Sequence, residues 1–180
     1  MKEFSYSSDN KLTAESIANK LASFLGGETP IVVCIGTDAA IGDSVGPLCG
    51  TMLKKRIKDT FVYGSLSSTV TAKEIAAIKT FLSEIHPLSR IVVVDAAVGS
   101  PEDVGYVKIS DSPIKPGLGA NKDLPALGDV SIIAIVGAKT KNSYELLSSA
   151  RLSSVYNLAK IVADGIEKYV ASTMDKELAV

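Results

Sequence analysis

The chain has 180 residues, of which 46% are hydrophobic and 22% charged, and its formal net charge is −1. Such a length and composition are typical of one globular domain with a sizeable core. The near-zero charge gives no general attraction to nucleic acid or to anionic membranes, and the apolar runs are too short to span a bilayer. The N-terminus, MKEFSYSSDNKLTAES, lacks the apolar core of a signal peptide, so we expect a cytoplasmic protein.

The first third of the chain predicts a helix, a strand and a second helix. Residues 13–25 place Ile17, Leu21 and Leu25 on one helical face. The run IVVCIG is apolar throughout, as in a strand that is covered on both faces. A helix is expected over 45–57. We therefore expect a single domain over 1–180, with an N-terminal arm and helix in 1–29 and a core in 30–171.

The rest of the chain continues this alternation of helices and strands. FVYGSL predicts a short strand, and TAKE at 71–74 is a capping box that predicts a helix from Thr71 to Ile85. RIVVVDAA and VSIIAIVGA predict buried strands, GYVKIS predicts a strand nearer an edge, and 144–171 predicts a long final helix. This order indicates an α/β sandwich whose mixed, mostly parallel sheet lies between two helix layers.

One connecting segment is unusually long. Residues 111–129, DSPIKPGLGANKDLPALGD, contain three prolines and three glycines. A segment of this length is uncommon in a compact domain unless it has a role, so it predicts a functional or partner-binding loop.

The loop after the first buried strand, GTDAAIGDSVG, allows three interpretations. A phosphate loop would need a lysine where Asp43 stands, and an aspartate there would repel phosphate. A serine nucleophile at Ser44 would need a histidine base. The single histidine, His86, precedes Pro87 at a helix end and is expected at the opposite end of the sheet. Ser44 is better interpreted as a helix N-cap.

The third interpretation is acid chemistry. Asp43 lies in the loop that leaves one strand, and Asp95 ends another apolar strand. If the two strands are neighbours, both carboxyl groups meet at the carboxyl edge of the sheet. Two close acids cannot both ionise easily, so the pair can share a proton and activate a water molecule. The alternative is that Asp43 caps a helix and Asp95 caps a turn.

The cysteines indicate no separate chemistry. Cys34 falls in a predicted strand and Cys49 in a predicted helix, without the spacing of a redox motif. Both are expected to be buried, small apolar residues. The shortage of histidine and clustered cysteine also argues against a zinc site.

Several motifs in order resemble the YyaC family of sporulation proteins over about residues 30–166. They are CIGTDAAIGDSVGPLCGTML, VYGSL with VTAKEI, VVVDAAVG, GYVKIS, PIKPGLGANKDLPALGDVSI and ARLSSVYNLAKIVADGI. That family is similar to the spore germination protease and, more distantly, to the hydrogenase maturation endopeptidases. The resemblance implies a three-layer α/β/α fold of the phosphorylase/hydrolase-like type.

The resemblance also implies roles for individual residues. IGDSVGP and VVVDAA match the two catalytic-acid motifs of the germination protease, which assigns those roles to Asp43 and Asp95. The hydrogenase endopeptidases hold nickel with similarly placed acids and a histidine. This chain has no histidine after Asp95, so no metal and no cofactor are expected.

The resulting hypothesis is a sporulation-associated, protease-like hydrolase that cleaves a protein substrate, such as a small acid-soluble spore protein. Its expected location is the cytoplasm, with the forespore as a candidate compartment. Substrate contacts are expected from three loop residues and two residues of the long connection. They are Gly36, Thr37, Gly42, Asn121 and Lys122. The backbone of the first three could supply N–H donors to an oxyanion.

Two rival hypotheses remain open. Related sequences tend to have threonine in place of Ile41, and histidine and asparagine in place of Thr71 and Glu74. These departures favour a non-catalytic sporulation binding protein that retains the protease fold. The third hypothesis is a nucleotide-binding α/β domain.

Overall fold

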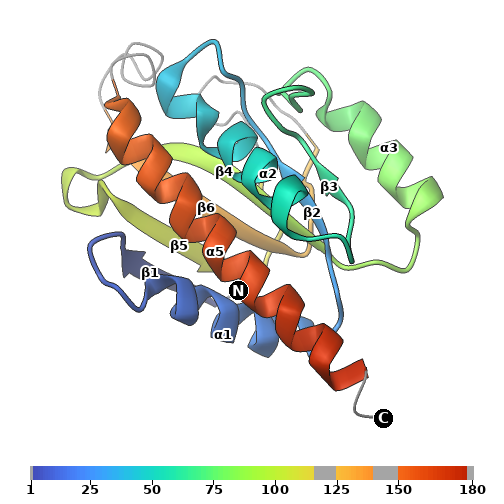
Figure 1. The fold of residues 1–180 in the computed structure, drawn as a ribbon. Coiled ribbons are helices and arrows are strands. Elements are labelled where there is room, and N and C mark those ends of the chain that lie inside the picture. Colours follow the sequence, from blue (N-terminus) through green and yellow to red (C-terminus); the bar gives the residue numbers. More distant parts are fainter. Residues whose placement is uncertain (1, 116–124, 140–149, 178–180) are drawn as a thin grey trace.

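A computed structural model describes residues 2–115, 125–139 and 150–177 of the chain. Its strands are β1 Glu3–Ser7, β2 Ile31–Cys34, β3 Val62–Tyr63, β4 Ile91–Gly99, β5 Tyr106–Ser110 and β6 Val130–Ala138. Its α-helices are α1 Thr13–Leu25, α2 Val45–Arg56, α3 Ile75–Ile85 and α5 Leu152–Glu177, with short 3-10 turns η1 Ile41–Ser44 and η2 Pro101–Asp103. Figure 1 shows how these elements are arranged.

The strands form one six-stranded sheet in the order β1-β5-β6-β4-β2-β3. The four strands β3, β2, β4 and β6 are parallel, β5 is antiparallel to β6, and β1 is antiparallel to β5. The central strands are apolar because both of their faces are covered. The predicted mixed, mostly parallel sheet is confirmed.

Helices cover both faces of the sheet, which confirms the three-layer architecture. Helices α1, α2 and α5 pack on one face and build the larger core, whose α1 contribution is Ile17, Leu21 and Leu25. Helix α3 packs Ile75 and Leu82 on the other face, in a smaller core. In Figure 1, α1, α2 and α5 lie over the sheet in one layer, and α3 lies apart from them.

Two boundaries differ from the sequence prediction. The predicted arm contains strand β1, which pairs Phe4 with Ile109, so this segment belongs to the sheet. The strand GYVKIS is β5, next to this edge strand, which confirms its expected place nearer an edge. The final helix runs from Leu152 to Glu177, because Ala150 and Arg151 are not helical, and residues 144–149 of the predicted helix lie outside the described residues. Polar strand residues at an edge carry little apolar signal, which explains why the sequence pattern missed β1.

Only one half of the capping box at 71–74 forms, and it begins a turn, because the Thr71 hydroxyl donates to the Glu74 carboxylate instead of accepting from the Glu74 N–H. The Glu74 carboxylate accepts a hydrogen bond from the Thr71 backbone N–H at 2.8 Å, as the motif predicts. The α-helix nevertheless begins at Ile75, with Glu74 at the N-cap position. The predicted start at Thr71 was therefore wrong by about one turn.

The base of the long connection is closed by two backbone hydrogen bonds between Ile114 and Leu127, of 3.0 and 2.9 Å. Leu127 is buried in the smaller core beside α3. Residues 116–124, with the predicted contacts Asn121 and Lys122, lie outside the described residues. Among the helices that the structure describes, none is long and apolar enough to cross a membrane.

Candidate active site

The two predicted acids belong to neighbouring strands at the point where the chain direction across the sheet reverses. Asp43 follows β2, whereas Asp95 lies within β4, which continues to Gly99 instead of ending at Asp95 as predicted. Strand β2 leads through α2 to β3 on one side, whereas β4 lies on the other side of β2 and leads on toward β5 and β6. In open α/β sheets, ligands bind beyond the carboxyl ends of the two strands at such a switch point.

Asp95 is held within β4, immediately beyond the residue that pairs with the end of β2. Val94 is opposite Cys34, so Asp95 lies level with Ile35. Strand alternation places its side chain on the same face as Val93, toward α3. Asp95 is only 8% exposed. Its Oδ1 accepts a hydrogen bond from the Ala96 N–H at 2.8 Å.

This environment disfavours the charged form of Asp95. Its pKa is raised to about 8, mainly by burial and also by the negative charge of Asp43, while the hydrogen bond from the Ala96 N–H opposes both effects. Asp43 therefore lies close enough for its charge to act on Asp95. A buried carboxyl group with such a pKa holds its proton at neutral pH.

Asp43 lies in η1, and the loop that carries it folds back on the end of β2. The Thr37 N–H donates to both the Asp43 carbonyl oxygen, at 3.2 Å, and its Oδ2, at 3.0 Å. The pKa of Asp43 is raised to about 6 by burial, against the opposing effect of the hydrogen bond from the Thr37 N–H. At neutral pH, Asp43 is therefore mostly ionised while Asp95 is protonated, so the pair offers a base and an acid.

Glycine is required where this loop begins. Gly36 has φ of +137°, and a Cβ at this position would lie 2.0 Å from the carbonyl oxygen of Asp43. A similar contact occurs in α2, where a Cβ at Gly46 would lie 1.9 Å from the Ile35 carbonyl oxygen. The motif GDSVG therefore contains a packing glycine that lets α2 approach β2 closely.

Ser44 takes the predicted N-cap position but makes no capping hydrogen bond to the helix. Its hydroxyl instead donates to the Ile41 carbonyl oxygen at 2.6 Å. The predicted capping role is therefore wrong in its chemistry, because the side chain stabilises η1 rather than the first turn of α2. The serine nucleophile hypothesis also lacks a base. His86 ends α3, which leads into the amino end of β4, and it is hydrogen-bonded to the Tyr63 hydroxyl at 2.7 Å.

The predicted oxyanion donors need a correction. The Gly36 N–H donates to the Val70 carbonyl at 2.9 Å, and the Thr37 N–H donates to Asp43. Neither group is free for an oxyanion, because the loop uses both to build itself. Gly42 is buried beside Asp43, and its role as a donor stays a prediction.

A segment that the sequence pattern did not place also borders the crevice. Val70 forms a parallel bridge with Ile35, and its carbonyl accepts a hydrogen bond from the Gly36 N–H, which places the segment before Thr71 beside the start of the loop that carries Asp43. Ile41, two residues before Asp43 in the same loop, is 38% exposed. A one-residue bridge of this kind has no periodic signal in the sequence.

The crevice offers two carboxylates rather than a metal-binding cluster. Within 2–115, 125–139 and 150–177, no group of three or more His, Cys, Asp or Glu side chains could hold a metal ion. The donor set here therefore does not match a two-acid-plus-histidine nickel site. Cys34 and Cys49 are buried, as expected, and carry free thiols.

Comparison with known proteins places the chain in a family. Residues 5–165 match the family model described as "Protein of unknown function (DUF1256)". The chain belongs to the DUF1256 family. A DUF1256 relative, "Uncharacterized protein YyaC" of Bacillus subtilis strain 168, is 41% identical over 160 residues, which span 85% of this chain and 77% of YyaC. The resemblance to the YyaC family is thereby confirmed.

A solved structure also aligns with this DUF1256 chain. It is the [NiFe] hydrogenase maturation protease HycI from Thermococcus kodakarensis KOD1. The TM-score is 0.49 and the identity 23%, over 83% of this chain and 99% of HycI.

Proposed function

We propose that this DUF1256 chain is a hydrolase that cleaves peptide bonds, with Asp43 as the general base and Asp95 as the general acid. The observation that supports this proposal is the acid pair itself: two carboxyl groups at the switch-point crevice, with pKa values of about 6 and about 8. An environment that gives two neighbouring acids different pKa values is characteristic of paired acid–base catalysts.

The proposed reaction follows from these protonation states. Asp43 removes a proton from a water molecule while the water oxygen attacks the carbonyl carbon of the scissile bond. The resulting tetrahedral species collapses when Asp95 gives its proton to the leaving nitrogen, and the C–N bond breaks. Asp43 then holds a proton and Asp95 a negative charge, and proton exchange through water restores the starting state.

The proposed substrate is a protein of sporulating cells. The resemblance to the germination protease makes a small acid-soluble spore protein the first substrate to test, and the corresponding proposed location is the cytoplasm of the forespore. This substrate choice rests on the resemblance, whereas the choice of acids rests on the geometry of the crevice.

The direct test is cleavage of small acid-soluble spore proteins by the wild type, Asp43→Asn and Asp95→Asn, followed by mass spectrometry. Each substitution keeps the side-chain shape but removes one acid, so we expect cleavage to fall by about 10²–10⁴-fold. Asp38→Asn is the matched control, because Asp38 is an exposed acid of the same loop and should leave the rate unchanged.

The pH dependence gives the same experiment a second readout. Cleavage by the wild type should follow a bell-shaped curve, with limbs near pH 6 and pH 8 that belong to the coupled pair. Equal cleavage by all four proteins would remove the acid pair from the mechanism. No cleavage by the wild type would end the claim for this substrate.

One observation favours the second candidate, a binding protein that retains the fold without catalysis. The Gly36 and Thr37 N–H groups are occupied within the loop, so two expected oxyanion donors are lost. Under this alternative, spore proteins would bind the wild type and Asp95→Asn with equal affinity, and calorimetry would detect binding without cleavage.

A further inference from the structure

Two isoleucines flank Asp95 in the sheet, one on each neighbouring strand. On β6, Ile133 is the residue paired with Asp95. On β2, Ile35 lies level with Asp95, because Cys34 pairs with Val94 and the Ile35 N–H donates to the Val94 carbonyl at 2.8 Å. Residues that are paired across neighbouring strands point to the same face of the sheet, so both isoleucine side chains lie beside the Asp95 carboxyl group.

The two isoleucines differ in how far they belong to the core. Ile35 is 3% exposed and packs with Val93 in the smaller core under α3. Ile133 is only half-buried. A change at Ile35 would therefore disturb the core as well as Asp95, whereas a change at Ile133 alters the flank of the carboxyl group with a smaller loss of packing.

The charges near Asp95 do not favour its ionisation. Among the described residues, the charge that acts on Asp95 is that of Asp43, and it opposes ionisation by repulsion. On the far side of Ile133, its β5 partner Lys108 forms an ion pair with Asp103 at 2.8 Å. This cation is therefore held by another acid. Helix α2 packs on the other face of β4, in the larger core.

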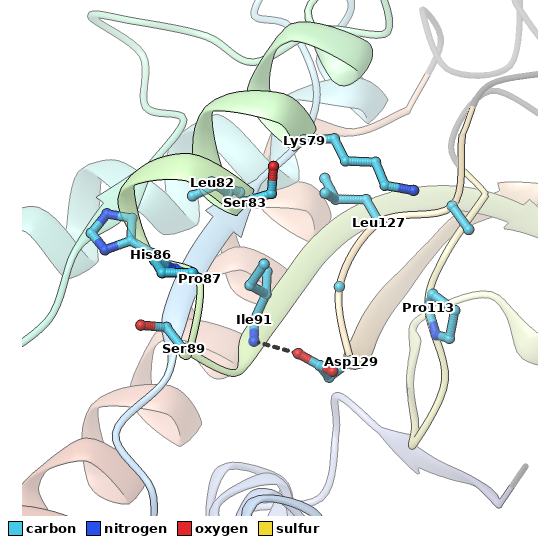
Figure 2. Close-up of a pocket in the computed structure, with 12 residues that line it drawn as sticks. Lys79, Leu82, Ser83, His86, Pro87, Ser89, Ile91, Pro113, Leu127 and Asp129 are labelled. Atoms are coloured by element: carbon cyan, nitrogen blue, oxygen red, sulfur yellow. Dashed lines mark hydrogen bonds between the residues drawn. The ribbon is translucent and has the colours of Figure 1, made fainter.

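Three further titratable groups lie near β4, but at its other end. A pocket at the start of the strand is lined by Lys79, His86 and Asp129. Figure 2 shows these side chains around Ile91, the first residue of β4, whose N–H donates to the Asp129 carboxylate at 2.8 Å. Asp129 thus has polar surroundings at the start of the strand, whereas Asp95 has an isoleucine on each side.

We propose that Ile133 is a positioning residue for Asp95, because it keeps water from one side of the carboxyl group and so holds Asp95 in its protonated form. An apolar neighbour disfavours the charged form of an acid, since it replaces water that would solvate the charge. The inference rests on the proposed function, in which Asp95 is the general acid, and it names a residue that maintains this role.

Two substitutions of Ile133 separate polarity from shape. Ile133→Val keeps an apolar side chain, whereas Ile133→Thr has nearly the shape of valine but carries a hydroxyl group that can donate to an ionised carboxylate. The ionisation of Asp95 is followed by NMR of isotope-labelled aspartate carboxyl groups, and Asp95→Asn identifies its signal. We expect Ile133→Val to titrate close to the wild type and Ile133→Thr about one pH unit lower.

Val136→Thr is the matched control, because Val136 is a half-buried residue of the same strand that packs against the larger core on the other face. It should leave the titration of Asp95 unchanged, and urea denaturation checks that every variant is folded. The proposal is overturned if Ile133→Thr titrates like the wild type, or if Val136→Thr moves the titration equally. It is also overturned if wild-type Asp95 titrates near its ordinary pKa of 3.8.

Cleavage gives a separate readout, because the titration needs no substrate. In Ile133→Thr, the alkaline limb of the cleavage profile should move down with the titration of Asp95, and Ile133→Val should keep the wild-type limb. A lowered titration in Ile133→Thr without any cleavage by the wild type would end the proposed function but support the positioning role. A lowered titration with an unmoved alkaline limb would show that Asp95 is not the general acid.

Discussion

The amino and carboxyl edges of the sheet differ in how their polar side chains are paired. At the amino edge, polar side chains have close partners, as His86 has in the Tyr63 hydroxyl and Asp129 in the Ile91 N–H and the Arg90 guanidinium, whose Nε lies 3.5 Å from Asp129 Oδ1. At the carboxyl edge, burial and like charge oppose the ionisation of Asp95. The amino edge therefore pairs its acid with an opposite charge, whereas the carboxyl edge keeps a buried acid whose charged form is disfavoured.

This difference favours the carboxyl edge as the location of a functional site. A buried acid with a shifted pKa lowers the stability of the fold. Folded proteins therefore keep such groups mostly at functional sites, where the shifted pKa is useful. The close backbone contacts at Gly36 and Gly46 constrain this edge further, since a Cβ at either position would overlap a backbone carbonyl oxygen. Substitutions at the two edges should therefore differ in their effects on stability and on cleavage.

Gly36→Ala should have the largest effect, because the new Cβ meets the Asp43 carbonyl oxygen at 2.0 Å in a backbone conformation that disfavours side chains. We expect a loss of stability on the order of 3 kcal/mol or more, together with loss of any cleavage. Urea denaturation measures the first effect. Gly26→Ala is the matched control, since Gly26 also has positive φ, +65°, but a Cβ there meets nothing within 4 Å.

For this control we expect only about 1 kcal/mol. Equal losses in the two variants would mean that backbone conformation alone, rather than contact with the Asp43 loop, explains the glycine. The carboxyl edge would then be less tightly constrained than the contrast requires.

The pH dependence of stability should come second. The folded-state pKa of Asp95, about 8, lies above its ordinary value of 3.8, so the folded chain keeps a proton that the unfolded chain releases. Its contribution is therefore favourable below pH 4 and is lost as the pH rises toward 8. We expect the free energy of unfolding to fall by a few kcal/mol over this range and the fall to shrink in Asp95→Asn.

Urea midpoints measured at several pH values check this expectation, with Asp38→Asn as the control that keeps the wild-type slope. A wild-type stability that rises between pH 4 and 8, with no change of slope in Asp95→Asn, would show that Asp95 ionises at its ordinary pKa.

Tyr63→Phe should have the smallest effect. It removes one partly buried hydrogen bond to His86 at the amino edge, so we expect a loss of about 1 kcal/mol. Cleavage should be unchanged, because the Tyr63–His86 pair lies at the amino edge of the sheet and the two acids lie toward the carboxyl edge. A large loss of cleavage without unfolding would show that the two ends are coupled.

The sequence predicted the architecture because its strongest periodic signals lie in the buried elements. The central strands IVVC and VSIIAIVGA are apolar throughout, and α1 repeats its apolar residues at helical spacing. The same patterns placed Asp43 after one strand and Asp95 on another, and the two strands proved to be neighbours, although β4 continues past Asp95 to Gly99. The polar strand β1 and the start of α5 were missed, since neither has such a signal.

What the sequence determined by itself is the order of the buried elements, the sheet type and the two acids to test. The tertiary structure decided that Asp43 acts electrostatically on Asp95 and that the Gly36 and Thr37 N–H groups are used within the loop. The physical reason is that pKa, hydrogen-bond partners and exposure depend on contacts between distant segments. Such contacts are set by the packing of the sheet and helices, which local residue patterns do not specify.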